Sequence, residues 1–289
     1  MLPARFDYHL PSTLEEALQL LSQNGDEAKV LAGGQSLIPV MKLRLAAPSH
    51  IVDINRLPGL DGIAEDDQGL AVGGLVRHKA LERSELLRAR YPAMATAAPL
   101  ISDPIVRNLG TIGGSLCHAD PAGDWGSVML ALGATVVVRS SRGERTLPIA
   151  EFLQDTFTTA LAPDEILTQI RIPKPQGRSG GTYLKMERKV GDFATAAAAV
   201  HLELSNGTIG RAGIALTAVG PKNIQASEAE TRLAGAEPTE ESFADAARLA
   251  AQAASPVSDL RGSAEYKRHI VEVFVRRGLA RALEIARAA

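Results

Sequence analysis

The sequence predicts an α+β protein with more than one domain, and three observations support this. The chain has 289 residues, whereas a typical domain has about 100–200. A stretch rich in proline, glycine and serine, PKPQGRSGGT at 173–182, is typical of a linker. Before it, short strand and helix patterns are mixed; after it, long strand patterns precede a series of helices. Strands followed by helices are the order expected of an α+β domain.

The first 55 residues are expected to form a small α+β subdomain. Thr13, with a glutamate three residues later, predicts the capped start of a helix that ends at Asn24-Gly25. Apolar runs at 29–32 and 50–54 predict two strands. Between these runs lie a Gly-Gly turn and a short helix.

Residues 56–175 are expected to form a second, mixed subdomain. Its predicted strands are at 70–74 and 166–172, with a hairpin whose strands are at 134–139 and 144–149. Helices are predicted at 79–90, 93–101 and 126–132, and a glycine-rich loop at 110–114.

Residues 178–289 are expected to form a C-terminal α+β domain. Two long strand patterns at 194–204 and 208–219 are joined by Asn206-Gly207, a strong hairpin signal. Amphipathic helices are then predicted at 225–235, 239–254 and 262–287.

Composition excludes several functions. The net charge of −2 argues against nucleic-acid binding, which needs a basic face. No window approaches the ~18 consecutive apolar residues of a membrane span, and the first residues lack a signal-peptide pattern, so we expect a cytoplasmic protein. Cys117 is the only cysteine, so this chain alone cannot hold a four-thiolate zinc site or an iron–sulfur cluster. The histidines show no metal-ligand spacing, and we expect no metal site here.

Two Gly-Gly segments are the strongest candidates for a binding site. One is Ala32-Gly33-Gly34-Gln35-Ser36 and the other is Thr111-Ile112-Gly113-Gly114-Ser115. Glycine pairs allow positive φ, so consecutive N–H groups can point into one concavity that binds a phosphate oxygen. Two such nests suit a diphosphate. Neither segment fits the dinucleotide or P-loop fingerprint, and the alternative is that both are merely tight turns.

Three longer stretches carry a family resemblance. They are AGGQSLIPVMKLRLAAPSHIVDINRLPGL at 32–60, ISDPIVRNLGTIGGSLCHADPAGDWGSVMLALGA at 101–134 and YLKMERKVGDFATAAAAV at 183–200. Their order and the total length resemble the FAD-binding medium subunit of the molybdenum hydroxylases, the family of carbon monoxide dehydrogenase and xanthine dehydrogenase.

The resemblance implies a fold and a cofactor site. The implied fold is an FAD-binding domain of the vanillyl-alcohol-oxidase type, with subdomains at 1–55 and 56–175, followed by a C-terminal domain of the carbon monoxide dehydrogenase flavoprotein type at 178–289. FAD is bound non-covalently, because the first loop offers no histidine for a covalent link. By resemblance, the FAD diphosphate contacts Ala32, Gly33, Gly34, Gln35, Ser36, Thr111, Gly113, Gly114 and Ser115. Other implied contacts are Ile101, Asp124, Leu161, Lys185 and Phe193. No catalytic residue is implied in this chain.

The resemblance also implies partners and a function. A large subunit would carry molybdopterin and oxidise the substrate, and a small subunit would carry 2Fe-2S clusters. The three chains would form an (LMS)2 heterohexamer in which FAD passes electrons from the clusters to an external acceptor. Position 35 is often histidine in carbon monoxide dehydrogenases, so Gln35 favours an organic substrate, and Ser115 replaces an Asp or Asn common in the family.

Two other classes of function stay open at this point. A self-sufficient flavin-dependent oxidoreductase would need its own substrate pocket, for which about 110 residues after the linker leave little room. A non-enzymatic module would use the glycine segments as turns only. Flavin absorbance near ~450 nm separates the module from the two flavoproteins, and substrate oxidation by the isolated chain separates the flavoproteins from each other.

Overall fold

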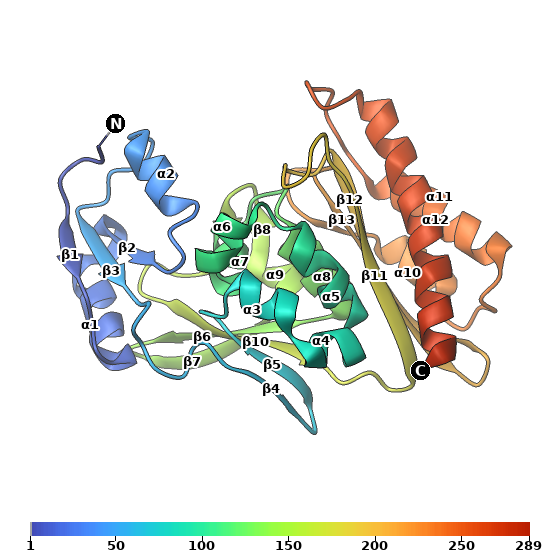
Figure 1. The fold of residues 1–289 in the computed structure, drawn as a ribbon, viewed down its shortest axis with the longest axis horizontal. Helices are drawn as coiled ribbons and strands as arrows, with labels where there is room; N and C mark the ends of the chain where they lie inside the picture. The colour runs from blue at the N-terminus through green and yellow to red at the C-terminus, as the bar shows by residue number, and fades with distance from the viewer. Residues whose placement is uncertain (1) are drawn as a thin grey trace.

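The computed structural model describes residues 2–289 and contains four sheets. Figure 1 shows the N-terminal region at one end of the molecule, a middle region with its own sheet, and the C-terminal sheet with its helices at the other end. Among the described residues, no helix combines the length and the apolar character that crossing a membrane requires.

The N-terminal region is a three-stranded parallel sheet with helices. The strand order is β1 (Asp7–His9), β3 (His50–Asp53), β2 (Ala28–Leu31). Its helices are α1 (Leu14–Asn24), η1 (Gly25–Glu27) and α2 (Leu37–Lys42). The predicted start of α1 is confirmed, because the Glu16 amide donates to the Thr13 hydroxyl at 3.1 Å.

The middle region is built on a five-stranded antiparallel sheet. Its order is β4 (Ile63–Asp66), β5 (Gly69–Gly73), β10 (Ile166–Pro173), β6 (Thr135–Ser140), β7 (Gly143–Pro148). The predicted hairpin is β6–β7. The remaining elements are α3 (His78–Arg83), α4 (Glu85–Arg90), α5 (Pro92–Ala97), η2 (Ala98–Leu100), α6 (Pro104–Leu109), α7 (Ile112–His118), α8 (Asp124–Leu132), α9 (Ile149–Phe152), β8 (Leu153–Asp155) and β9 (Thr158–Thr159).

Two predicted helices of this region are each broken in two. The helix predicted at 79–90 is interrupted at Ser84, whose hydroxyl accepts from the Leu87 amide at 3.3 Å and so starts α4 as a separate helix. The helix predicted at 93–101 ends as α5 and continues as the 3-10 turn η2, which contains Pro99. Proline cannot supply the amide that a continuous α-helix needs.

The C-terminal region is a four-stranded antiparallel sheet between two groups of helices. The strands are β11 (Arg178–Met186), β12 (Ala196–Ser205), β13 (Thr208–Thr217) and β14 (Ile224–Gln225). Helices α10 (Ser227–Leu233), α11 (Glu240–Ala253) and α12 (Ala264–Ala288) pack on the outside, and α5 and α8 contact the sheet from the middle region (Figure 1). Asn206 and Gly207 have φ of 50° and 86°, which confirms the predicted hairpin.

The linker predicted at 173–182 is wrong for most of its length. Only residues 174–177 connect the two strands, because Pro173 is the last residue of β10 and residues 178–182 form the first half of β11. A β-carbon on Gly180 would lie 2.0 Å from the Ala282 carbonyl oxygen of α12. The glycines that suggest a linker therefore allow a helix to pack closely on a strand.

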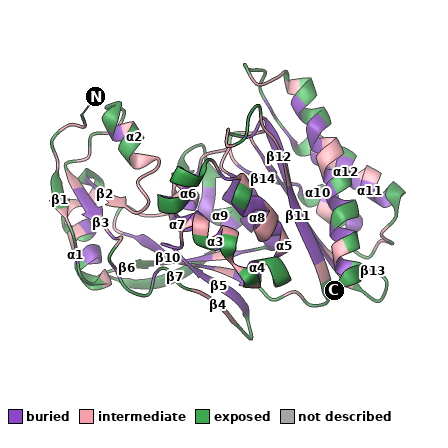
Figure 2. Cartoon of the chain, in the orientation of Figure 1, coloured by how far each residue is buried: buried purple, intermediate pink, exposed green. Residues whose placement is uncertain are grey.

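The regions share hydrophobic cores. One core joins Trp125 and Met129 of α8 to Tyr183, Ala197 and Ala215 of the C-terminal sheet. Another joins residues of α1 to residues of the middle region, including Leu60, Leu75 and Ile166. Figure 2 shows buried residues along α8, β11 and β12. The division at 55 and 175 stays a prediction, because packed side chains cross both boundaries.

Candidate functional site

The fold brings the two glycine segments into contact. The first segment follows β2 and leads into α2, and the second follows α6 and begins α7. A β-carbon on Gly33 would lie 2.5 Å from the Leu109 carbonyl oxygen and 2.7 Å from the Gly110 Cα. A β-carbon on Gly114 would be 3.9 Å from the Ala32 Cβ. Glycine at position 33 therefore allows the backbones of two regions to touch.

The first segment has the donors that a phosphate site needs. Within the described part of the chain, the amides of Gly33, Gly34, Gln35 and Ser36 form no hydrogen bond to protein atoms. Gly34 has a φ of +72°, a conformation that favours glycine. The Gln35 side chain donates to the Gly33 carbonyl at 3.1 Å. All five residues from Ala32 to Ser36 are partly exposed, so an anion can reach these amides.

The second segment is not a nest, which corrects the prediction. Neither Gly113 nor Gly114 has a positive φ, because both lie in the first turn of α7. The Gly113 amide donates to the Gly74 carbonyl at 3.0 Å and the Gly114 amide to the Thr111 hydroxyl at 3.1 Å. The Ser115 amide donates to the Thr111 carbonyl at 3.0 Å. The segment can therefore offer a ligand the Ser115 side chain and a surface without side chains at its glycines, but not the amides of Gly113, Gly114 and Ser115.

The glycines of the second segment are required by close packing. A β-carbon on Gly113 would lie 2.5 Å from the Gly74 carbonyl oxygen. The His78 amide donates to the Gly110 carbonyl, and the Ile112 amide donates to the Val76 carbonyl, each at 3.0 Å. The segment is therefore held edge to edge against residues 74–78.

Asp124 and Lys185 meet in a buried cluster with Tyr183. The Tyr183 hydroxyl donates to Asp124 Oδ1 at 2.6 Å, and Lys185 Nζ donates to Asp124 Oδ2 at 3.1 Å and to the Leu100 carbonyl at 2.9 Å. The Lys185 side chain is only 2% exposed. Burial raises the pKa of Asp124, against the opposing effects of Lys185 and Tyr183. These groups join α8 to β11.

The same cluster contains an unpartnered oxygen. Glu187 Oε2 lies 3.6 Å from Lys185 Nζ and is buried without a hydrogen bond among the described residues. Two carboxylates therefore face one ammonium group. A bound molecule with a hydrogen-bond donor would complete this arrangement.

Ile101 and Phe193 lie on neighbouring segments. Ile101 is buried, whereas Phe193 is 55% exposed in the loop between β11 and β12. A β-carbon on Gly191 of this loop would be 3.0 Å from the Ser102 carbonyl oxygen. Arg261 donates to the Phe193 carbonyl at 3.2 Å and so anchors the loop. The loop that carries Phe193 therefore packs against the backbone next to Ile101.

Leu161 is the remaining predicted site residue. It is half-buried and packs against the central core between β9 and β10.

Sequence reasoning missed two polar residues between the glycine segments, Asn55 and Arg77. Their side chains hydrogen-bond to each other at 2.6 Å. Asn55 also donates to the Ala32 carbonyl of the first segment, and Arg77 donates to the Leu109 carbonyl just before the second. The only local signal was that Asn55 is a polar residue directly after a strand. Arg77 lies in no motif, so only the fold identifies it.

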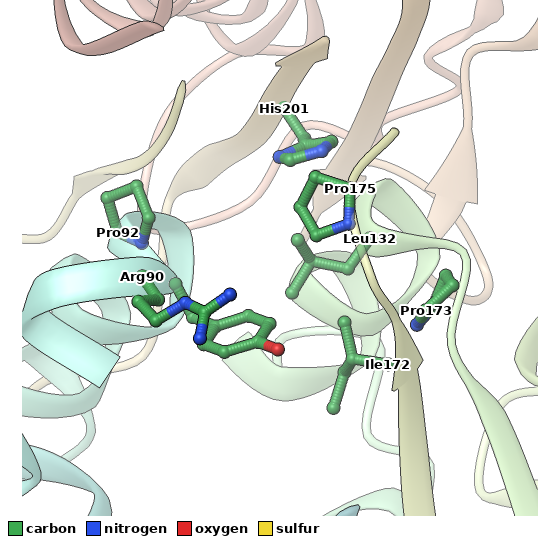
Figure 3. Close-up of a pocket in the computed structure, with 8 residues that line it drawn as sticks. Arg90, Pro92, Leu132, Ile172, Pro173, Pro175 and His201 are labelled. Carbon is green, nitrogen blue, oxygen red and sulfur yellow. The ribbon is translucent and has the colours of Figure 1, made fainter. Parts of the chain in front are cut away.

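The cavity shown in Figure 3 is a different feature. It lies between Arg90, Pro92, Ile172 and His201 and has a volume of about 10 Å³. Such a volume holds about one water molecule. None of the predicted site residues lines this cavity, and it is far too small for a dinucleotide.

Comparison with known proteins agrees with this architecture. Residues 4–175 match the family described as "FAD binding domain in molybdopterin dehydrogenase", and residues 181–282 match the "CO dehydrogenase flavoprotein C-terminal domain". The carbon monoxide dehydrogenase medium chain of Hydrogenophaga pseudoflava is 42% identical over 96% of this chain and 97% of its own length. The 6-hydroxypseudooxynicotine dehydrogenase complex subunit alpha of Paenarthrobacter nicotinovorans is 40% identical over 99% and 97%.

A solved structure shows the same fold. The chain superposes with a TM-score of 0.95 on a chain of carbon monoxide dehydrogenase from Hydrogenophaga pseudoflava, at 42% identity and 99% coverage of both chains. The fold and the matched families thus define an FAD-binding subunit of an oxidoreductase. The chain belongs to the family of FAD-binding medium subunits of the molybdenum hydroxylases. The predicted resemblance, the α+β fold and FAD as the cofactor are confirmed.

Proposed function

We propose that this chain binds the FAD diphosphate on the four free amides of residues 33–36. The observation that carries the proposal is the set of consecutive N–H groups without protein partners, in a segment pressed against the start of α7. Backbone amides that point into one concavity are typical anion donors. The second segment contributes the Ser115 hydroxyl and a surface that Gly114 leaves free of a side chain.

The remaining predicted residues are proposed to surround the rest of the cofactor. The buried pair of Asp124 and Lys185 holds α8 against β11, and Ile101, Leu161 and Phe193 supply apolar surface. Phe193 lacks a hydroxyl, so it packs against a ring without donating a hydrogen bond. No histidine lies in the first segment, and we propose that FAD is bound non-covalently.

We further propose that the chain is an electron-transfer subunit in a cytoplasmic complex. FAD supplies the ability to accept electrons singly and release them in pairs. A large subunit with molybdopterin would oxidise the substrate, and a small subunit with 2Fe-2S clusters would deliver the electrons, in an (LMS)2 heterohexamer. The single cysteine supports this division, because the clusters must be bound by another chain.

The substrate is proposed to be selected by the large subunit. The two relatives described above carry the names of carbon monoxide and 6-hydroxypseudooxynicotine dehydrogenases, at 42% and 40% identity. The Gln35 side chain donates to the Gly33 carbonyl, so its role in this structure is to stabilise the conformation of the first segment. That role gives no preference between an organic substrate and carbon monoxide.

The relay is tested by removing FAD from the complex purified with its partner subunits. We expect substrate still to reduce the iron–sulfur clusters, while reduction of the natural acceptor stops until FAD is restored. The isolated chain reconstituted with FAD should not be reduced by substrate. Rapid flavin reduction by substrate in the isolated chain would contradict the relay and support a self-sufficient flavoenzyme.

Assembly gives a second test. Co-expression of the three subunits should yield one particle that contains this chain, as measured by size-exclusion chromatography with mass determination. An active enzyme formed by the other two chains alone would contradict the assignment.

A further inference from the structure

A continuous set of side-chain hydrogen bonds runs from the first glycine segment to the backbone just before the second. Asn55 Nδ2 donates to the Ala32 carbonyl at 2.7 Å, just before the first Gly-Gly pair. Arg77 Nη2 donates to Asn55 Oδ1 at 2.6 Å, and Arg77 Nη1 donates to the Leu109 carbonyl. Two side chains from different regions therefore connect the backbone of one segment to the backbone before the other.

The orientation of Asn55 is fixed from the N-terminal side. Its amide N–H and its Nδ2 both donate to Asp53 Oδ1, at 2.9 Å and 2.7 Å. The other carboxylate oxygen, Asp53 Oδ2, accepts from the Tyr8 hydroxyl at 2.6 Å. Asn55 thus uses its two side-chain N–H groups on Ala32 and Asp53, which leaves its oxygen for Arg77.

Arg77 is fixed from the middle region. Its backbone pairs with Thr111 in an isolated antiparallel bridge. The planar guanidinium group donates to Asn55 and to Leu109 at the same time. A lysine ammonium group does not hold its donors in a rigid plane and so cannot reproduce both hydrogen bonds. The Leu109 carbonyl that accepts from Arg77 is the same group that touches Gly33.

We propose that Asn55 and Arg77 are positioning residues for FAD, because they set the spacing between the free amides of 33–36 and the start of α7. This inference rests on the proposed diphosphate site. Neither residue needs to touch the cofactor. The pair sets the distance between the two segments at the junction of the N-terminal and middle regions, where no helix or sheet of the described chain spans both regions.

The test measures FAD affinity in the complex, after flavin removal, for Asn55→Ala, Arg77→Gln and the double variant. Each single variant should raise the FAD dissociation constant about 10-fold or more, because a hydrogen bond on which the site geometry depends is lost. The FAD dissociation constant of the double variant should be about equal to that of the weaker-binding single variant, because both residues belong to one chain of hydrogen bonds. Arg77→Lys should also weaken binding.

Matched controls separate positioning from general stability. Asn24→Ala removes another asparagine-to-carbonyl hydrogen bond, the 2.8 Å bond to Leu20 within α1, which involves neither segment. Arg171→Gln removes an arginine on β10 whose hydrogen bonds go to the side chains of Gln169 and Gln68 and whose ion pair is with Asp66. Both controls should keep the wild-type FAD dissociation constant, even if the melting temperature of the flavin-free protein falls.

The outcomes are distinct. Equal FAD affinity in wild type, Asn55→Ala and Arg77→Gln would overturn the inference, as would full retention of affinity in Arg77→Lys, which would show that charge alone matters. Additive losses in the double variant would also overturn it. A wild-type complex that binds no FAD would instead refute the proposed function itself.

Discussion

The contact between Gly33 and the Leu109–Gly110 backbone predicts the effect of a single methyl group. In Gly33→Ala the new Cβ would lie 2.5 Å from the Leu109 oxygen, whereas non-bonded carbon contacts are comfortable at about 3.5 Å. Both neighbours are backbone, so the two segments must separate by about 1 Å. Such overpacking costs about 1–3 kcal/mol. If this cost falls on the FAD-bound state, FAD affinity should decrease about 5- to 150-fold.

The assay is titration of FAD into flavin-depleted complex, with flavin content checked by absorbance. Gly62→Ala is the matched control, because a β-carbon there meets no atom within 4 Å and its φ is not in the left-handed region. This control should bind FAD like the wild type and be as stable or slightly more stable. Wild-type affinity and melting temperature in Gly33→Ala would refute the described packing of the segments.

Two further predictions concern buried charge. Trp125 Nε1 donates to His78 Nδ1 at 3.0 Å, and burial lowers the pKa of His78 from 6.5 to about 4. Between these pH values the unfolded chain binds more protons than the folded one, so stability should fall by about 3 kcal/mol as pH drops through this window. Urea unfolding of His78→Asn, which keeps an acceptor for Trp125, should lack this part of the pH dependence; an unchanged profile would contradict it. Lys185→Met leaves Asp124 and Glu187 without their cation and should cost about 3–5 kcal/mol in thermal unfolding, with partial recovery when Asp124→Asn is added; a loss below about 1 kcal/mol would show that the cluster is not a buried ion pair.

Local structure was predictable where its cause is local. The Thr13 cap and the Asn206-Gly207 hairpin depend on residues a few positions apart, so their signals lie in short windows of sequence. The family was predictable because three long stretches match it along the whole chain. These same stretches contain both glycine segments.

Strand β11 was not predictable from its own residues. Gly180 and Gly181 indicate a linker by composition, yet they lie in a strand covered by α12, which begins some 80 residues later in the chain. Close packing by a distant helix, and not local preference, decides the conformation of this segment.

The chemistry of the site was decided by the tertiary structure. The sequence alone presents two similar Gly-Gly pairs and therefore predicts two equal phosphate nests. In the fold, Gly74 and Thr111 accept hydrogen bonds from the amides of Gly113 and Gly114, while the amides of 33–36 have no partner among residues 2–289. Asn55 and Arg77 meet only because two regions pack together. The sequence by itself predicted FAD as the cofactor, which the family match confirms, and two candidate backbone segments for binding it. Which hydrogen-bond donors remain available on those segments depends on contacts between residues that are distant in the chain.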